Sequence, residues 1–330
     1  MSTPPPTFGA LGAIPLDLFQ RAADRFDLGP VADFAALGGA HGNNVGLTAG
    51  SRAWVLRAAV GPVTVDTLRR ERFFAQTIVE QSRMAAPQPY LMDESSGIFG
   101  WPYALMARLP GTVLQYTHRR DWYEVGRELG YAVAALHGIR FPHAGEWSPS
   151  LDAIAPAGLA PDAWFARRFA SFQQRLGETW TSLDADSRAL VERAVDAAIP
   201  TIEGYDPTYV HGDLGIANLV GHETRDGFAF TGVVDLGGGL AGDPDEDLAV
   251  PIWWPLYWGN AEAARSFIEG YRGVRPPRAR QKVRVRAYVA ISLLTNWDVG
   301  RRHGHDWYGG ARTFHQWAAP LLDRVTRVLG

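Results

Sequence analysis

The sequence has no cysteine among its 330 residues, which excludes disulfide bonds, thiolate metal sites and cysteine nucleophiles. Lysine is nearly absent as well, because Lys282 is the only lysine among the 32 basic residues. An arginine at a position where phosphate-binding proteins use lysine can therefore reflect composition and not a lost function.

Long apolar runs and an excess of positive charge are also lacking. The longest clean apolar run, residues 287–294, is too short to span a bilayer. Residues 1–6 have neither the charged n-region nor the apolar h-region of a secretory signal. The net charge of -3 argues against a general nucleic-acid binder, which would be basic. We therefore expect a cytoplasmic protein that binds neither membrane nor nucleic acid, and the sequence implies no protein partner.

What is present is ordinary for a soluble globular protein, with 46% apolar and 20% charged residues. A chain of 330 residues is long enough for a large core or for two lobes. The order of the predicted elements favours two lobes, since strands dominate the first third of the chain and helices dominate the rest.

The most informative stretch is residues 209–220, Tyr-Val-His-Gly-Asp-Leu-Gly-Ile-Ala-Asn-Leu-Val. Apolar residues at both ends predict two strands, so His211, Asp213 and Asn218 lie on the loop between them. Asp213 and Asn218 have the D-x-x-x-x-N spacing of phosphoryl-transfer loops, in which the aspartate accepts the proton of the attacking hydroxyl and the asparagine holds Mg²⁺. The simpler alternative is that both residues only cap turns, which is their commonest use.

A predicted hairpin adds a further carboxylate, that of Asp235, to the candidate site. Residues 222–227 give a turn signal, and residues 228–234 read as a returning strand that ends on Asp235. Because a hairpin brings its two ends together, we expect Asn218 and Asp235 to reach one cation. Mg²⁺ prefers hard oxygen ligands and fills its remaining positions with water and substrate phosphates, so one amide and one carboxylate suit it.

The first third of the chain predicts a sheet over the phosphates. Residues 34–37, 45–48 and 54–59 read as three strands, and a glycine-rich turn at residues 38–44 joins the first two. We take Gly39 and Val45 as candidate nucleotide contacts in this segment. Glycine turns are also common in ordinary hairpins, so this stretch alone is weak evidence.

A helix over residues 62–84 carries an inward-facing charge. Leu68, Glu71, Ala75 and Ile78 fall at i, i+3 and i+4 steps on one face, and Glu71 has no cation three or four residues away. A buried carboxylate is costly unless a distant cation pairs with it, and Arg57 in the third strand is the candidate. Such a pair would position nucleotide phosphates. The alternative places Glu71 on the helix flank in water and Arg57 on the surface.

Residues 101–106 predict a strand, and Pro110-Gly111 breaks the chain after it. We predict a nucleotide-binding lobe at residues 1–106, of which 1–29 are a lead-in, a hinge at 107–111, and a catalytic and acceptor-binding lobe at 112–330. Met106 borders this hinge, and Ala107 and Leu109 can offer a C=O and an N–H to the adenine edge.

The second lobe is predicted to be mainly helical, with helices beginning near Asp121 and at residues 162–177 and 185–198. Further along, Asp247 is expected to cap the next helix and brace its loop, and Asp243 fits a turn before a proline. The basic run 275–286 reads as a solvated helix face. Most of the tryptophans are expected in the core, and some could wall an acceptor pocket.

With these residues in view, the chain resembles the aminoglycoside phosphotransferase and choline-kinase-like family, which has the protein-kinase fold. The resemblance runs from about residue 34 to 250, and its motifs are His211-Gly-Asp-x-x-x-x-Asn218, Val234-Asp235 and Gly242-Asp-Pro-x-x-Asp-Leu248. Residues 105–111, Leu-Met-Ala-Arg-Leu-Pro-Gly, resemble the hinge of the family. The resemblance implies an α+β, bilobal protein-kinase-like fold with a small β-rich N-lobe and a larger, mainly helical C-lobe.

The family's activity is Mg²⁺-dependent O-phosphorylation of a small hydroxylated molecule, with ATP or GTP as donor. The resemblance implies that Asp213 is the base in a catalytic loop that includes His211. It further implies that Asn218 and Asp235 hold Mg²⁺ and that Arg57 and Glu71 position the phosphates. Here Arg57 stands where many members have lysine, although others carry Leu-Arg.

Three functions compete. The first is an aminoglycoside-type antibiotic-resistance kinase, whose polycationic acceptor needs a carboxylate-lined pocket; candidates for its lining are Asp243, Asp245, Glu246, Asp298 and Asp306. The second is a metabolic kinase for choline, a sugar, an amino acid or a macrolide, which the tryptophans would suit. The third is a non-catalytic nucleotide-binding module, which the arginine at position 57 would suit.

Overall fold

The computed structural model describes residues 14–37, 44–114, 121–225, 227–304 and 308–330. The chain divides into two compact units. The first comprises Met1–Gly111 together with Trp147–Ala153 and Gly232–Gly237, and the second comprises Thr112–Glu146, Ile154–Thr231 and Gly238–Gly330. A small sheet dominates the first unit and helices dominate the second, which confirms the predicted α+β class. The exact lobe and hinge boundaries stay a prediction.

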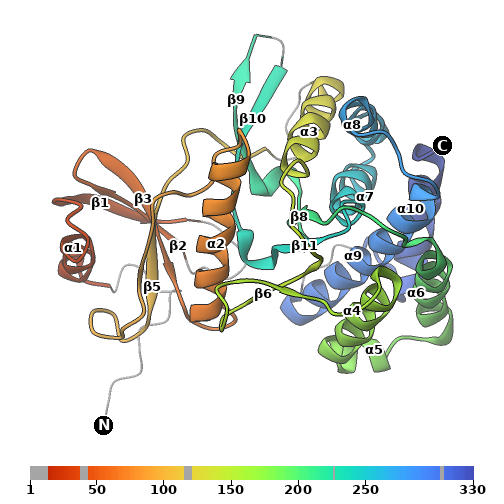
Figure 1. The fold of residues 1–330 in the computed structure, drawn as a ribbon, viewed down its shortest axis with the longest axis horizontal. Helices are drawn as coiled ribbons and strands as arrows, with labels where there is room; N and C mark the ends of the chain where they lie inside the picture. Colours follow the sequence, from red (N-terminus) through yellow and green to blue (C-terminus); the bar gives the residue numbers. More distant parts are fainter. Residues whose placement is uncertain (1–13, 38–43, 115–120, 226, 305–307) are drawn as a thin grey trace. The chain divides into compact units, whose positions relative to one another are not determined.

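The first unit is built on a five-stranded sheet in which each strand is antiparallel to its neighbour. Its spatial order is β1 (Val31–Ala36), β2 (Asn44–Ala49), β3 (Arg52–Ala58), β5 (Tyr103–Ala107) and β4 (Tyr90–Asp93). Two helices, α1 (Leu16–Asp24) and α2 (Val65–Gln81), lie on opposite sides of this sheet (Figure 1).

The alternation of side chains along β3 decides what each face of the sheet carries. Trp54, Leu56 and Ala58 are buried in the apolar core that includes α1. Because successive side chains of a strand point to opposite faces, Arg57 is directed to the other face, toward α2. That helix starts at a capping box formed by Thr64 and Thr67. Its buried face contains Leu68, Glu71, Phe74, Ala75, Thr77 and Ile78.

The chain after Gly111 is mainly helical. Its helices are α3 (Trp122–Leu136), α4 (Pro161–Leu176), α5 (Glu178–Thr181), α6 (Ala185–Ala198), α7 (Ala249–Tyr257), α8 (Ala261–Val274), α9 (Gln281–His303) and α10 (Phe314–Val328). Its strands are β6 (Gly145–Ser148), β7 (Ala153–Pro156), β8 (Thr208–Val210), β9 (Leu219–Thr224), β10 (Gly227–Val233) and β11 (Leu240–Gly242). They form a four-stranded sheet, β7-β6-β11-β8, and a two-stranded sheet of β9 and β10. The predicted hairpin is therefore present.

Helices α3 and α8 lie side by side in the second unit (Figure 1). Glycines make this close approach possible, since a Cβ on Gly130 would collide with the backbone of Phe267 and Tyr271. A Cβ on Gly270 would collide with the backbone of Arg127 in the same way. The helix pair therefore brings the last turn of α3 and the side chains of α8 into direct contact.

The basic run at residues 275–286 does not form a solvated helix face, so that prediction is wrong. Arg284 is 3% exposed and donates to Asp245 at 2.7 Å. Arg278 pairs with both Asp243 and Asp245. The run instead supplies the counter-charges for two buried carboxylates, because a buried charge must be paired.

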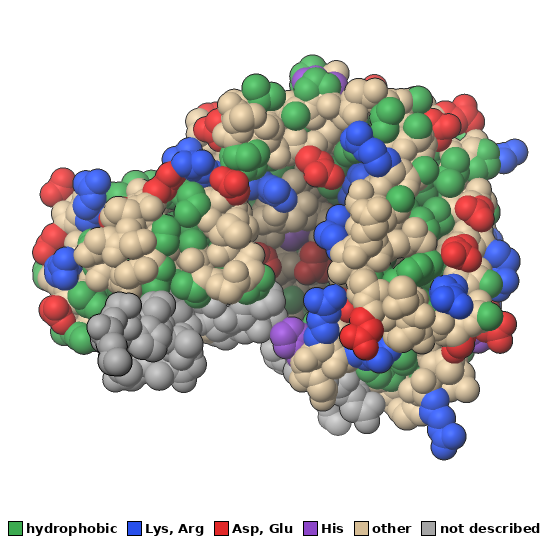
Figure 2. All heavy atoms as spheres, turned by 90° about the horizontal axis from the view of Figure 1, so that it is seen from below, with side chains coloured by type: hydrophobic (Ala, Val, Ile, Leu, Met, Phe, Trp, Pro, Cys, Tyr) green, Lys and Arg blue, Asp and Glu red, His purple; other side chains and the backbone are tan. Residues whose placement is uncertain are grey.

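The surface of the described residues carries both signs of charge. On the face in Figure 2, basic and acidic side chains are interspersed on each unit. Within the described ranges, no helix has the length and apolar character needed to cross a bilayer.

Candidate active site

The loop after β8 is held by buried hydrogen bonds. Backbone N–H groups of His211 and Gly212 donate to the two carboxylate oxygens of Asp247, at 2.7 and 2.8 Å. Gly212 has φ +82°, a left-handed conformation that disfavours any residue with a Cβ, which explains a glycine between the histidine and the aspartate. Asp247 therefore braces this loop, as predicted. The prediction that Asp247 also caps the next helix is wrong, because no side chain caps the start of α7.

Asp213 is exposed, and its neighbours His211 and Asn218 form hydrogen bonds with it. Its backbone N–H donates to Nδ1 of His211, whose ring is buried. The side-chain amide of Asn218 donates to the Asp213 backbone oxygen at 2.8 Å and to its carboxylate Oδ2 at 3.3 Å. A solvent-facing carboxylate on a rigid loop is suited to accept a proton from a bound hydroxyl.

The first unit contains the predicted cation–carboxylate pair. Arg57 Nη2 lies 2.9 Å from Glu71 Oε1 and 3.0 Å from Asp235 Oδ1. The Tyr90 hydroxyl donates to Glu71 Oε2 at 2.7 Å. The side chain of Glu71 is only 4% exposed, so these partners offset the cost of burying its charge.

Burial and charge act in opposite directions on Arg57. Burial lowers the pKa of Arg57, but the negative charges of Glu71 and Asp235 more than offset this, so its pKa is raised. Burial, and then the Glu71 charge, raise the pKa of Tyr90 well above its usual value. Arg57 therefore stays a cation and Tyr90 stays a hydrogen-bond donor at all ordinary pH values.

Asp235 is the exposed member of this cluster. Its side chain is 51% exposed, and its backbone has φ +61°, a conformation that costs a residue with a Cβ about 1 kcal/mol or more. Among the described residues, no group of three or more histidine, aspartate or glutamate side chains converges on a metal site. The predicted magnesium site has only one carboxylate, Asp235, and one amide, Asn218, so it is too small to count as such a group. Because the Asn218 amide nitrogen is engaged by Asp213, its side-chain oxygen is the group that remains for a cation.

A model of the phosphotransferase enzyme family matches residues 34–284. The chain belongs to this family. Two solved structures show the fold: APH(2″)-IIIa with GDP and kanamycin is 18% identical, with a TM-score of 0.66 over 95% of this chain and 99% of that chain. A thermostable mutant of APH(4)-Ia with ADP and hygromycin B is 16% identical, with a TM-score of 0.64 over 94% and 97%. No curated protein matches the chain. The predicted family, the protein-kinase-like fold and the phosphotransferase class are thereby confirmed.

The segment that the sequence predicts as a hinge in this phosphotransferase has a defined pattern of backbone hydrogen bonds. Ala107 N–H donates to the carbonyl of Pro89, and Arg108 N–H donates to the carbonyl of Ala53. In an antiparallel ladder the Ala107 carbonyl would accept from residue 89, but proline has no N–H. Among the described residues the Ala107 carbonyl thus has no strand partner, and the Leu109 N–H donates to no backbone carbonyl. These are the two groups that the sequence predicts to face a purine edge, and that role stays a prediction.

The other three predicted nucleotide contacts are Gly39, Val45 and Met106, and the structure does not show a side chain of any of them open to a nucleotide. Gly39 lies outside the described residues. Val45 is fully buried in the core beside α1, on the face of the sheet opposite to Arg57, so only its backbone could reach a nucleotide. Met106 lies in β5 and is 7% exposed; it pairs with Tyr90 of β4 on one side and with Val55 of β3 on the other.

The candidate acidic lining for a polycationic acceptor is already neutralised where the structure describes it. Asp243 and Asp245 are buried against Arg278. Glu246 pairs with Arg168 through both of its oxygens, at 2.6 and 2.7 Å. Asp298 accepts from Thr179 and Arg302 at 2.6 and 2.9 Å, and Asp306 lies outside the described residues. These carboxylates are therefore structural and are not supported as acceptor contacts.

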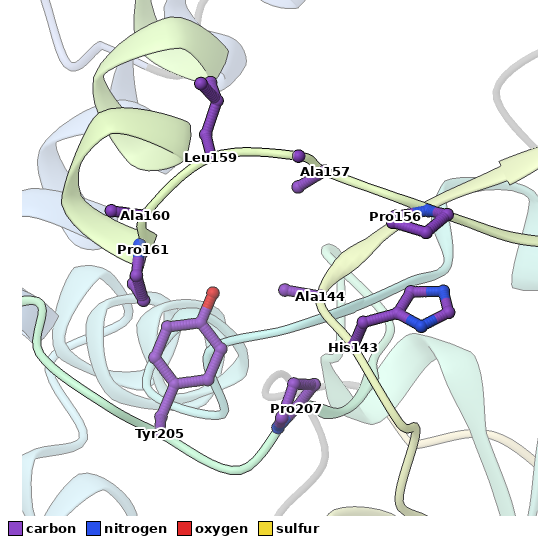
Figure 3. Close-up of a pocket in the computed structure, with 10 residues that line it drawn as sticks. His143, Ala144, Pro156, Ala157, Leu159, Ala160, Pro161, Tyr205 and Pro207 are labelled. Atoms are coloured by element: carbon purple, nitrogen blue, oxygen red, sulfur yellow. The ribbon is translucent and has the colours of Figure 1, made fainter.

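The phosphotransferase has an open cavity of about 360 Å³ in its second unit (Figure 3). Its walls come from residues 143–144 and 156–161 and from Tyr205 and Pro207, and the Tyr205 hydroxyl points between them. Tyr205 and Pro207 precede β8, whereas His211 follows it, so this cavity and the Asp213 loop lie at opposite ends of one strand. The cavity therefore does not include Asp213.

The partners of two site residues escape reasoning from the sequence. Tyr90 lies on a strand of four residues and touches Glu71, which precedes it by 19 positions. His137 is the C-cap residue of α3 and contacts Asp247, which follows it by 110 positions. No periodicity links such pairs, although a polar residue among buried neighbours is a general signal for a satisfied partner.

Proposed function

We propose that this protein is an ATP- and Mg²⁺-dependent O-phosphotransferase for a small hydroxylated molecule, with Asp213 as the general base. The observation that carries this proposal is the exposed Asp213 carboxylate on a loop whose backbone is fixed by buried Asp247 and whose flank is fixed by Asn218. A turn-capping aspartate would not need such a frame.

In the proposed reaction, Asp213 accepts the proton of the acceptor hydroxyl as that oxygen attacks the γ-phosphorus. The bond between the γ-phosphorus and the bridging oxygen breaks, and the nucleoside diphosphate leaves. A positioned base of this kind contributes roughly 10²–10⁴-fold to the rate. His211 acts indirectly, because its buried ring accepts the Asp213 N–H.

The nucleotide is proposed to bind through the first unit. Arg57, held by Glu71, offers a guanidinium that binds phosphate oxygens through two donors, which lysine does not. The Ala107 carbonyl and Leu109 N–H would pair with the adenine edge, and Gly39, Val45 and Met106 stay as predicted contacts. Asn218 and Asp235 supply the oxygen donors that Mg²⁺ prefers, and Mg²⁺ when bound neutralises charge on the phosphates. That these two side chains share one ion is a prediction from the hairpin sequence.

Aminoglycosides are the first acceptor class to test, because the two solved structures described above carry kanamycin and hygromycin B. A second candidate is a neutral or singly charged hydroxylated molecule. The observation that favours it is the pairing of Asp243, Asp245 and Glu246 with arginines, which removes negative charge that a polycation would need. Resistance to an antibiotic and a cytoplasmic location are part of the first proposal only.

The test is an ATP-turnover screen with kanamycin, hygromycin B, choline, simple sugars and a macrolide as acceptors. We expect acceptor-stimulated ADP formation that depends on Mg²⁺ and is lost in Asp213→Asn. Asp206→Asn, at an exposed aspartate before β8, is the matched control and should keep the full rate. Tight ATP binding without stimulation by any acceptor, and with no effect of Asp213→Asn, would instead support a non-catalytic nucleotide-binding module.

A further inference from the structure

A series of buried, hydrogen-bonded polar groups connects helices α3 and α8 to the Asp213 loop. The Tyr271 hydroxyl lies 2.9 Å from His137 Nδ1, and His137 Nε2 lies 3.4 Å from Asp247 Oδ2. The same Asp247 carboxylate accepts the backbone N–H groups of His211 and Gly212. His137 is fully buried, and Tyr271 and Asp247 are nearly so.

The chemistry of the partners fixes the direction of each hydrogen bond. An ionised carboxylate only accepts, so His137 Nε2 carries the hydrogen and donates to Asp247. His137 Nδ1 is then a bare acceptor, and the Tyr271 hydroxyl donates to it. Burial raises the pKa of Tyr271, which keeps this hydroxyl protonated. In this series Tyr271 therefore donates to His137, and His137 donates to Asp247.

Helix packing determines where the imidazole lies. His137 directly follows α3 as its C-cap residue, and Gly130 and Gly270 let α3 approach α8 closely enough for Tyr271 to reach the His137 ring. The ring in turn faces Asp247 in the short helical turn Glu246–Leu248. A solvated surface histidine would have none of these partners.

We propose that His137 is a positioning residue for phosphoryl transfer. By holding Asp247, it fixes the backbone of His211 and Gly212 and therefore the place of the Asp213 carboxylate. This inference rests on the proposed role of Asp213. It goes beyond that role because it makes the end of α3, which touches no reacting atom, a determinant of the rate.

The test compares His137→Phe, which removes both ring nitrogens, with His137→Gln, whose amide can still donate to Asp247. Tyr271→Phe removes only the hydroxyl and is the milder variant if His137→Phe folds poorly. Turnover of Mg-ATP is measured with kanamycin as acceptor or, where kanamycin is not phosphorylated, with water. Amide hydrogen exchange is measured for the peptide that contains residues 211–213.

We expect His137→Phe and Tyr271→Phe to lower kcat by up to about 10²-fold, the effect of misplacing a catalytic group by about 1 Å. KM for Mg-ATP should stay within about twofold, because the Arg57–Glu71 pair is untouched, and His137→Gln should recover most of the rate. Exchange at residues 211–213 should be faster in the impaired variants. In an Asp213→Asn background, His137→Phe should cause no further loss.

An unchanged kcat and unchanged exchange in both His137→Phe and Tyr271→Phe would overturn the inference. So would an equal loss in the Asp213→Asn background, since that would indicate general damage. If Asp213→Asn alone keeps the full rate, the proposed base is wrong, but the exchange data still decide whether His137 holds the loop. The two failures are therefore distinguishable.

Discussion

Replacing Glu71 by glutamine tests whether the buried cluster of the first unit is stabilising. The substitution keeps the shape of the side chain and removes its charge. Glu71 forms an ion pair with Arg57 at 2.9 Å and accepts a hydrogen bond from the Tyr90 hydroxyl at 2.7 Å, and its side chain is 4% exposed. Solvent screening is therefore weak for both contacts.

The expected magnitude follows from those two contacts. A hydrogen bond to a charged group contributes about 1.5–3 kcal/mol and a neutral one about 0.5–1.5 kcal/mol, so weakening the Tyr90 contact costs about 1–1.5 kcal/mol. Breaking a buried ion pair costs about 3–5 kcal/mol when it leaves the other charge unpaired. Arg57 keeps Asp235 as a second partner, so it is not left unpaired. We expect a total loss of about 2–3 kcal/mol, which corresponds to a fall in melting temperature of roughly 5–10 °C for a domain of ordinary size.

The assay is thermal and urea unfolding, with Glu94→Gln as the matched control. Glu94 pairs with Arg69 in the same unit, but both side chains are more than a third solvent-exposed. Exposed pairs contribute little, so the control should leave the melting temperature unchanged. Equal shifts for Glu71→Gln and Glu94→Gln would refute the reasoning that burial makes the Arg57–Glu71 pair matter.

Three further predictions concern other parts of the molecule. Gly130→Ala should lower the free energy of unfolding by about 1–3 kcal/mol in urea unfolding, because its methyl group meets the backbone of α8, whereas Gly273→Ala has open space and should not destabilise. Hydrogen bonds from the N-terminus of α6 lower the pKa of Asp184. Its contribution is thus present above an unfolded pKa of about 4 and lost as pH falls through the folded pKa, and Asp184→Asn should remove this dependence from urea midpoints. Asp235→Ala should abolish the magnesium dependence of nucleotide binding in titration calorimetry; an unchanged dependence would contradict its role as a ligand.

Much of the fold follows from local pattern. Helix α6 was predicted at residues 185–198 and occupies Ala185–Ala198, because its apolar spacing and the capping Asp184 are both local signals. The first three strands and α2 also follow from their own residues. Strands β4, β6 and β7 were not predicted, because segments of four residues carry too little periodicity to stand out.

The site divides in the same way. The pairing of Arg57 with Glu71 was predictable, since an inward-facing carboxylate without a local cation requires a distant one. The arginines at residues 275–286 were misjudged because a charge run looks solvated until Asp243 and Asp245, more than 30 positions earlier, are placed beside it. The partners of Tyr90 and His137 cannot be predicted in this way, because they are defined only by tertiary packing.

The measurement that tests the central claim most directly is the single-turnover rate of γ-phosphoryl transfer from Mg-ATP by the wild-type protein and by Asp213→Asn. The account predicts a rate lower by roughly 10²–10⁴-fold in the variant, with nucleotide affinity and melting temperature unchanged. A variant that transfers phosphate at nearly the wild-type rate would show that Asp213 is not the base, and the proposed mechanism would be wrong.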